Sequence, residues 1–113
     1  MRVGIDLVEH KDMENRDERF IKHILTEPEY SYYSSITNKK RRIEYLSSRF
    51  ACKEAIFKCY QTGVAFQDIT ILNDSLGAPY VLIQYKKVEL NLSLSHTDNY
   101  SVAIAILPLS DDD

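Results

Sequence analysis

Hydrophobic residues alternate with other residues at the start of the chain. In the stretch "VGIDLV", Val3, Ile5 and Leu7 alternate with the residues between them. A repeat of two is typical of a β-strand with one buried face, and the charged Glu9 interrupts it. We therefore predict a buried strand that ends near Glu9.

The middle of the chain shows the spacing of three and four residues that marks amphipathic helices. A first helix is predicted over residues 12–25. A second begins at Thr26, where "TEPE" combines an N-cap, a proline in the first turn and a glutamate placed for a capping box. Residues 39–60 hold neither glycine nor proline and predict the longest helix. It should end at residues 61–63, where Gly63 can adopt a left-handed backbone conformation.

The repeat of two returns after the long helix. Residues 68–72 and 79–85 flank a turn and predict one β-hairpin, and residues 88–95 and 100–107 predict a second. These elements favour an α+β fold in which an antiparallel sheet packs against the long central helix, with the first strand inserted among the later ones. The acidic run 111–113 is expected to form a solvated tail.

Composition limits both the size of the fold and the class of partner. The chain has 113 residues, of which 44% are hydrophobic, and this predicts a single domain over residues 1–113. The formal net charge is −3, which argues against the broad positive field of nucleic-acid-binding proteins. The N-terminal apolar run is short, and no stretch approaches the ~20 apolar residues that span a bilayer. We therefore expect a cytoplasmic protein that binds neither nucleic acid nor membrane.

Glu54 interrupts the apolar stripe of the predicted long helix. It lies between Phe50 and Phe57 at helical spacing, where an isolated ionised carboxylate would be costly to bury. Asp6 raises the same question in the first strand, because its neighbours are apolar. Two acids that are distant in sequence thus break apolar patterns.

Two explanations of these acids remain open at this point. In the first, each carboxylate makes a buried ion pair, and Lys53, Lys58 or Arg49 is the partner of Glu54. In the second, Asp6 and Glu54 converge on one divalent cation. Oxygen ligands without histidine or cysteine favour magnesium, which is held by one or two carboxylates together with substrate phosphates and water. Lys58, one helical turn after Glu54, would then face a phosphate.

The three histidines do not resemble a metal-binding set. His10 and His23 lie in or beside the charged first helix and are expected to be solvated. His96 lies in "SLSHT", at the end of a strand, where a turn projects functional side chains from a rigid sheet. A serine hydrolase is disfavoured because no nucleophile elbow or oxyanion glycine motif surrounds Ser93 or Ser95.

Basic residues cluster at two places. Arg16, Arg19 and Lys22 recur every three residues on the first helix, and Lys39–Arg42 opens the long one. These clusters are either ordinary solvated helix surface or a docking site for an acidic protein.

Several stretches, taken in order, resemble one family. They are "GIDLVEH", "RF" followed by "ILTEPE", "YLSSRFACKEAIFK", "TGV", "FQDITIL", "GAPY" and "LSLSHTDNYSVAIA". Together they are similar to the holo-acyl-carrier-protein synthases, the small type of 4′-phosphopantetheinyl transferase, over nearly the whole chain. The pairing of "GID" with "RFACKEA" is specific, and "SLSHT" adds an independent third match.

This resemblance implies transfer of the phosphopantetheine arm of coenzyme A to a serine of apo-acyl-carrier protein, in fatty acid biosynthesis, with release of adenosine 3′,5′-bisphosphate. It also implies a homotrimer with an active site at each subunit interface. Asp6 and Glu54 would bind Mg²⁺ and would act with Lys58 as the catalytic residues. The serine nucleophile would come from the carrier, and either Glu54 or a water molecule on the metal would accept its proton.

The remaining site residues also follow from the resemblance. Coenzyme A would be bound by Arg49, Lys58, Gly63, His96 and Thr97. The acidic carrier protein would dock on Arg16, Arg19 and Arg41.

The chain departs from the family pattern at several positions. Gln61 replaces a glycine that usually precedes "TG", and Leu76 and Ala78 replace polar and basic residues in a turn that helps to hold the nucleotide. Asp12 stands where a basic docking residue is often found. These differences motivate an alternative function, a protein that binds coenzyme A or the carrier without catalysis.

Overall fold

A computed structural model describes residues 1–61 and 63–109. Thr62 and the predicted tail at residues 111–113 lie outside the described residues. In chain order the elements are β1 (Arg2–Glu9), η1 (His10–Met13), α1 (Glu18–Ile24), α2 (Glu27–Ser35), α3 (Lys39–Tyr60), η2 (Phe66–Asp68), β2 (Ile69–Asn73), β3 (Pro79–Ile83), β4 (Lys86–Lys87), β5 (Asn91–His96) and β6 (Tyr100–Leu107).

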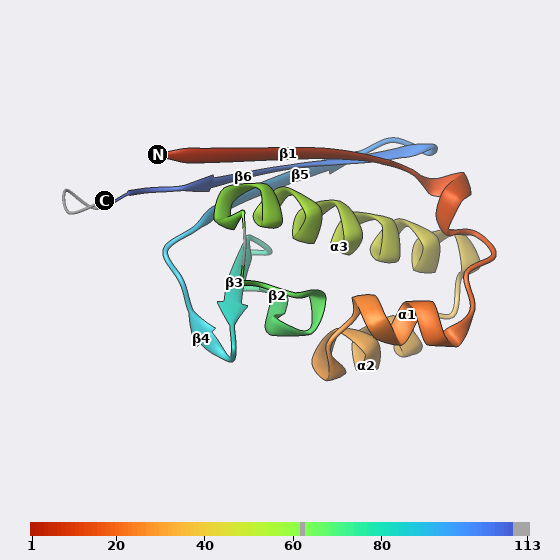
Figure 1. Ribbon diagram of the computed structural model, residues 1–113. Helices are drawn as coiled ribbons and strands as arrows, with labels where there is room; N and C mark the ends of the chain where they lie inside the picture. Colours follow the sequence, from red (N-terminus) through yellow and green to blue (C-terminus); the bar gives the residue numbers. More distant parts are fainter. Residues whose placement is uncertain (62, 110–113) are drawn as a thin grey trace.

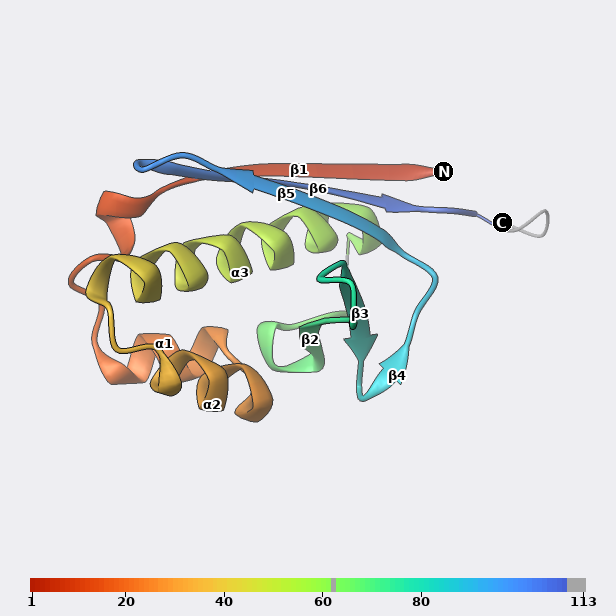
Figure 2. The ribbon, with the colours of Figure 1, turned by 180° about the vertical axis from the view of Figure 1, so that it is seen from behind.

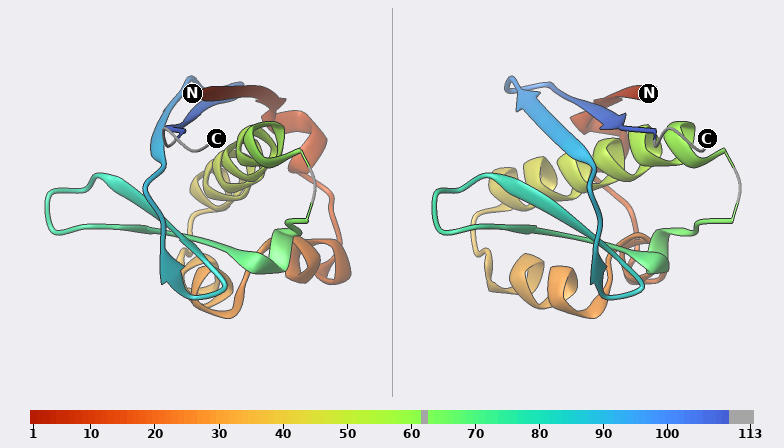
Figure 3. Two further views of the ribbon diagram at one scale, coloured as in Figure 1. Left: turned by 60° about the vertical axis from the view of Figure 1, so that its left-hand side comes forward. Right: turned by 90° about the vertical axis from the view of Figure 1, so that its left-hand side faces the viewer.

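The elements form layers on two sides of α3. The first sheet has the order β1-β6-β5 and the second the order β2-β3-β4, and all neighbouring strands are antiparallel. The first sheet lies along one side of α3, while α1, α2 and the second sheet lie on the other (Figures 1 and 2). The turn between β2 and β3 extends away from the helices (Figure 3). The predicted α+β class is confirmed, with two sheets in place of one.

Helix α3 covers the residues predicted for the longest helix. The side chain of Asn38 caps its first turn by accepting a hydrogen bond of 3.0 Å from the backbone N–H of Arg41. The helix ends at Gln61, which has a φ of 68°, and Gly63 follows with a φ of 83°. The left-handed conformation predicted for Gly63 is therefore present, and Gln61 adopts a positive φ as well.

Small residues on α3 allow the first sheet to approach it closely. Ala51, Ala55 and Cys59 are fully buried. A Cβ atom on Gly4 of β1 would lie 1.9 Å from the backbone oxygen of Ala55, so only glycine fits at this point of the strand. These small residues form the buried side of α3, and Glu54 lies next to that side, where it is half-buried. The prediction that Glu54 lies in the middle of the buried apolar stripe is therefore wrong.

The alternation of β1 is oriented opposite to the prediction. Gly4 and Val8 are buried, whereas Val3, Ile5 and Leu7 are 52%, 56% and 64% exposed. Within the described part of the chain the strand lies at an edge of the sheet and pairs only with β6, so the prediction that it is inserted among the later strands is wrong. Gly4 explains the inversion, since the side of the strand that meets α3 must be the side that carries the glycine.

The first predicted helix is divided into two elements. Residues His10–Met13 form the short 3-10 helix η1, and α1 begins only at Glu18. Asp17 starts the second element, because its carboxylate accepts a hydrogen bond of 2.9 Å from the backbone N–H of Phe20.

A buried ion pair joins α3 to the layer that contains α2. Lys53 Nζ lies 2.6 Å from Glu29 Oε1, and both side chains are fully buried. The ammonium also donates to the backbone oxygens of Ile24, at 2.7 Å, and Phe66, at 3.1 Å. Lys53 therefore has its partners in other elements and is not the partner of Glu54.

The carboxylate of Glu29 is equally well satisfied. It accepts hydrogen bonds of 2.9 Å from the backbone N–H groups of Thr26 and Ile71. The bond to Thr26 is the one predicted for a capping box at the start of α2. The second bond reaches β2, so one carboxylate connects α2, α3 and the second sheet.

Candidate active site

Two acidic side chains and a lysine meet beside β1. Asp6 comes from β1, and Glu54 and Lys58 come from successive turns of α3. Lys58 Nζ lies 3.6 Å from Asp6 Oδ1 and donates a hydrogen bond of 2.6 Å to the backbone oxygen of Ile5. Glu54 is close enough to Asp6 and Lys58 for both charges to alter its pKa. The structure thus brings together the three residues that were predicted to be catalytic.

Desolvation raises the pKa of both carboxyl groups in this cluster. For Asp6, desolvation outweighs the attraction and hydrogen bonding of Lys58, which lower the pKa. For Glu54, desolvation is again the largest cause, the negative charge of Asp6 raises the pKa further, and Lys58 opposes both. Two acids therefore face one lysine, and a further positive charge would stabilise their ionised forms.

The carboxylates fit a cation that is shared with a phosphate ligand. Among residues 1–61 and 63–109, no three His, Cys, Asp or Glu side chains are grouped so that they could hold a metal ion by themselves. Mg²⁺ usually takes only one or two carboxylates and completes its shell with substrate phosphates and water. Asp6 and Glu54 provide two carboxylates, and partial burial raises the pKa of each, so a cation between them would stabilise their ionised forms.

A pocket of about 280 Å³ lies beside β5, and we call it the Arg49 pocket. Its walls include Arg41 and Arg49 from α3 and His96 from the end of β5. A second pocket of about 310 Å³ adjoins it and shares Arg49 and the aromatic ring of Tyr45. Three residues predicted to bind coenzyme A or the carrier are thus placed around one concave surface.

Arg49 is a buried cation without a carboxylate partner among the described residues. Its side chain is only 6% exposed, and the guanidinium carbon lies 4.6 Å from the ring centre of Tyr45. Its Nε has no hydrogen-bond partner in the described part of the chain. A buried donor is costly when nothing accepts from it, so Arg49 favours an anionic ligand in this pocket.

The turn after β5 holds His96 at the rim of the Arg49 pocket. His96 Nε2 lies 3.6 Å from Glu44 Oε2 on α3. Thr97 Oγ1 accepts hydrogen bonds of 3.1 Å from the backbone N–H groups of Asn99 and Tyr100. In the structure Thr97 therefore shapes the turn that positions His96.

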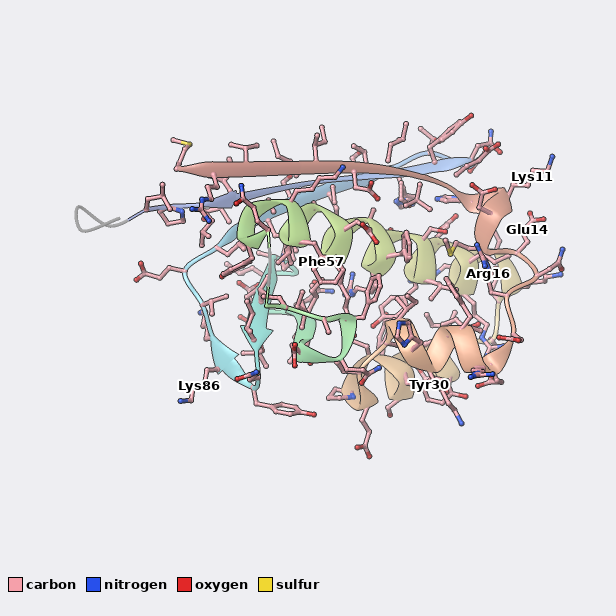
Figure 4. The ribbon with its side chains drawn as sticks, in the orientation of Figure 1. Lys11, Glu14, Arg16, Tyr30, Phe57 and Lys86 are labelled. Atoms are coloured by element: carbon pink, nitrogen blue, oxygen red, sulfur yellow. The ribbon has the colours of Figure 1, made fainter. Side chains whose placement is uncertain are left out.

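The basic residues predicted to receive the carrier lie in different places. Arg16, which Figure 4 labels, precedes α1, donates to the backbone oxygen of Asp12 at 3.0 Å, and has its guanidinium carbon 4.3 Å from the ring centre of Phe20. Arg19 is exposed on α1, whereas Arg41 is on the first turn of α3 and lines the Arg49 pocket. Gly63, predicted to bind coenzyme A, lies in the exposed loop after α3.

The two groups of predicted site residues are separated within one chain. Asp6 belongs to β1 and His96 to β5, which are the two edge strands of the first sheet. Glu54 and Arg49 share α3 but are five positions apart, which corresponds to about 140° around the helix axis. The carboxylate cluster and the Arg49 pocket therefore lie at opposite edges of the sheet.

His10 differs from the prediction that it is solvated. It is only 5% exposed, its Nε2 lies 2.8 Å from Ser101 Oγ, and its Nδ1 lies 3.0 Å from the backbone oxygen of Asp98. The sequence contained one signal for this burial, since His10 comes two residues after Val8 and continues the buried side of β1. His23 is exposed as predicted.

The chain belongs to the 4′-phosphopantetheinyl transferase superfamily, whose family model matches residues 2–105. The holo-[acyl-carrier-protein] synthase of Staphylococcus carnosus is 40% identical over 112 residues, which cover 93% of this chain and 94% of the relative. The enzyme of that name from Oceanobacillus iheyensis is 42% identical over 112 residues and 93% of each chain. The resemblance inferred from the motifs is therefore confirmed.

Solved structures show the same fold. A holo-(acyl-carrier-protein) synthase from Bacillus anthracis in complex with CoA (3′,5′-ADP) has a TM-score of 0.81 and 33% identity, and the match covers 92% of each chain. A holo-ACP-synthase from Plasmodium yoelii has a TM-score of 0.79 and 27% identity, over 92% of this chain and 91% of the other. Within the described residues, no helix has the length and apolar character required to cross a membrane.

Proposed function

We propose that this chain transfers 4′-phosphopantetheine from coenzyme A to a serine of apo-acyl-carrier protein, in fatty acid biosynthesis. Relatives at 40% and 42% identity are holo-[acyl-carrier-protein] synthases over nearly their whole length. Within the chain, the observation that supports the proposal most is the meeting of Asp6, Glu54 and Lys58 beside β1. A protein that only binds coenzyme A or the carrier would not need this costly group of charges, so catalysis is favoured over that alternative.

The chemistry explains what these charges do. A bond forms between the serine oxygen and phosphorus, the serine proton passes to Glu54 or to a water molecule, the bond from phosphorus to the bridging pyrophosphate oxygen breaks, and adenosine 3′,5′-bisphosphate leaves. Negative charge grows on the phosphate oxygens during the transfer. Lys58 places an ammonium group beside them, and Asp6 and Glu54 would hold Mg²⁺. When bound, the ion would stabilise the charge of the pyrophosphate.

The Arg49 pocket is the proposed site for the nucleotide part of coenzyme A. Arg49, Arg41 and His96 offer hydrogen-bond donors to its phosphate groups, and Thr97 and Gly63 are further proposed contacts. Arg16 and Arg19, which are exposed, remain the proposed docking residues for the acidic carrier. The cytoplasmic location stays a prediction.

We further propose that three copies of the chain assemble with an active site at each interface. The outer face of β1 and β6 is apolar, because Val3 is paired with Ile106, Ile5 with Ile104 and Leu7 with Val102. Among residues 1–61 and 63–109 no other element covers this face, and the side chains of β1 stand out from it (Figures 1 and 4). A contiguous exposed apolar patch marks an interaction surface. Assembly would also bring the carboxylate edge of one copy to the Arg49 pocket of another.

Leu7→Glu is expected to prevent this assembly. The Leu7 side chain is 64% exposed in the single chain, so the substitution leaves the core intact but would place a charge in the proposed interface. Sedimentation equilibrium should give about three times 13.1 kDa for the unmodified chain and 13.1 kDa for the variant. Leu76→Glu is the matched control, because Leu76 is 92% exposed and lies in the β2–β3 turn. An unmodified chain that sediments as a monomer would contradict the trimer.

The proposed activity is tested by measuring the molecular mass of the carrier protein. Apo-acyl-carrier proteins are incubated with the chain, coenzyme A and Mg²⁺, and mass spectrometry follows the carrier serine. We expect the carrier to gain one phosphopantetheine group, and the gain to require Mg²⁺. If several carriers remain unmodified while coenzyme A still binds, the non-catalytic alternative is the correct one.

A further inference from the structure

A buried hydrogen-bond chain leads from His10 to the wall of the Arg49 pocket. His10 Nε2 lies 2.8 Å from Ser101 Oγ, which lies 3.1 Å from Ser48 Oγ. The three residues are only 5%, 1% and 7% exposed. Ser48 lines the Arg49 pocket, whereas His10 lines a different pocket near the start of α3. The hydrogen-bond chain therefore connects two separate concave surfaces.

The backbone oxygen of Asp98 determines the direction of these hydrogen bonds when His10 is neutral. It lies 3.0 Å from His10 Nδ1 and can only accept, so Nδ1 carries the hydrogen. Nε2 then accepts from the Ser101 hydroxyl, and Ser101 accepts from Ser48. Because a serine has one hydroxyl hydrogen, Ser48 offers only lone pairs to the pocket in this state.

Protonation of His10 reverses the hydrogen bonds. Both ring nitrogens then donate, so Ser101 accepts from Nε2 and turns its own hydrogen toward Ser48. The hydroxyl hydrogen of Ser48 is released and can be donated into the Arg49 pocket. An anion accepts hydrogen bonds and does not donate them, so it favours this second arrangement.

We propose that an anion in the Arg49 pocket accepts a hydrogen bond from the Ser48 hydroxyl and thereby favours the protonated form of His10. Ser101 couples the two residues, because its hydroxyl hydrogen turns from His10 to Ser48. The inference rests on the proposed function, which places a phosphate group of coenzyme A in this pocket. One proton moves from solvent to His10 Nε2, and two hydroxyl hydrogens change their acceptors. Ser48 is then a ligand-binding residue, and Ser101 and His10 are positioning residues.

The surroundings of His10 allow it to carry a charge. Its pocket also contains Lys39, Lys40, Glu14 and Asp98, which are two basic and two acidic residues. Lys40 and Asp98 form an exposed ion pair of 2.9 Å, so the acidic and basic groups around His10 offset one another. The pocket gives solvent protons a route to the ring.

His96 is the second histidine near this site and has its own environment. Its ring centre lies 6.4 Å from that of His10, and its Nε2 lies 3.6 Å from Glu44 Oε2. His96 is paired with Ser101 across β5 and β6, but its side chain has no hydrogen bond to the side chain of Ser101 or Ser48 among the described residues. Because the side chain of His96 is not part of this hydrogen-bond chain, we expect the protons that His96 and the ligand phosphates exchange to change little when Ser101 is changed.

The number of protons taken up on binding tests this proposal. Calorimetric titration of the full chain with adenosine 3′,5′-bisphosphate, in buffers of different ionisation enthalpy at pH 7, measures that number. Ser101→Ala should take up fewer protons than the unmodified chain, by up to about one, and should bind roughly five- to tenfold more weakly. Ser101 is not part of the pocket lining, so a lost ligand contact cannot explain the change.

Two further variants complete the experiment. Ser48→Ala breaks the same hydrogen-bond chain at the pocket and should lose the same proton uptake. Ser47→Ala is the matched control, because Ser47 is a buried neighbour on α3 whose hydroxyl has no hydrogen-bond partner among the described residues. It should keep the proton count of the unmodified chain.

The outcomes separate this inference from the proposed function. If the unmodified chain, Ser48→Ala and Ser101→Ala bind the nucleotide with equal proton counts, the coupling to His10 is wrong and the coenzyme A site stands. If the unmodified chain does not bind the nucleotide at all, both the coupling and the proposed coenzyme A site are wrong.

Discussion

Glu54→Gln is expected to lower the rate of carrier modification about 100-fold or more while the chain stays folded. Glutamine has nearly the same shape, but it removes one of the two negative charges proposed to hold Mg²⁺ beside the pyrophosphate. Because Glu54 is half-buried at the side of α3, its replacement opens no cavity. The measurement is kcat/KM for the carrier over a range of Mg²⁺ concentrations. A variant that keeps both full activity and its Mg²⁺ requirement would contradict the assignment.

The same substitution should make the chain slightly more stable at neutral pH. The pKa of Glu54 is raised above its ordinary value of 4.5 in the folded chain, because of desolvation and the charge of Asp6. Folding therefore favours the protonated form, and the stability that this form contributes is lost as the pH rises through the raised pKa. Glutamine is never ionised, so the variant should melt on the order of 2 °C higher at pH 7.

The difference in melting temperature between Glu54→Gln and the unmodified chain should become much smaller at pH 4, where Glu54 is mostly protonated in both the folded and the unfolded chain. Glu89→Gln serves as the control, because Glu89 is an exposed glutamate in the segment before β5. It should change neither the activity nor the melting temperature at either pH. A stabilisation by Glu54→Gln that is equal at pH 4 and pH 7 would show that its cause is not the carboxylate charge.

Lys53→Met is expected to lower the free energy of unfolding by about 3–5 kcal/mol. Removal of one partner of a buried ion pair leaves the other charge in a medium that cannot solvate it. Here the stranded group would be the carboxylate of Glu29, which is fully buried. The backbone oxygens of Ile24 and Phe66 would also lose their donor. Urea denaturation of the variant and the unmodified chain gives the difference.

Two controls test whether burial is the cause of this loss. Lys40→Met removes an exposed ion pair with Asp98 of 2.9 Å, and it should cost much less stability than Lys53→Met because solvent screens both charges. Adding Glu29→Gln to Lys53→Met should restore part of the stability, because the amide is neutral and its single oxygen can still accept from the backbone N–H of Thr26, although its NH₂ group cannot accept from Ile71. Equal losses for Lys40→Met and Lys53→Met would contradict the argument.

The parts of the fold that depend on local sequence were predictable. The bounds of α3 follow from its helical spacing and from the absence of glycine and proline over residues 39–60, and Asn38 supplies the cap. The orientation of β1 was not predictable from alternation. A repeat of two shows which residues share a face, but it does not show whether that face meets the core of the same chain or another surface. Gly4 was the available signal, because a strand that lies against a helix needs a small residue there.

The candidate site was predictable where residues broke a local pattern. Asp6 and Glu54 each interrupt an apolar segment, and the structure places them together with Lys58. Glu29 and His10 broke no pattern, since a glutamate in a capping box and a histidine near charged residues are ordinary. Their burial depends on partners that are distant in sequence, Lys53 for Glu29 and Ser101 for His10.

Helix α3 has a consequence for cooperation between copies of the chain. It carries Glu54 toward one edge of the first sheet and Arg49 toward the other. In the proposed trimer each α3 would therefore serve two reaction centres, one through each residue. A copy inactivated at Glu54 would still contribute Arg49 to the active site at one interface. A copy inactivated at Arg49 would still contribute Glu54 to the active site at the other. A mixture of the two inactive variants would then regain activity, because some interfaces would combine an intact Glu54 from one chain with an intact Arg49 from the other.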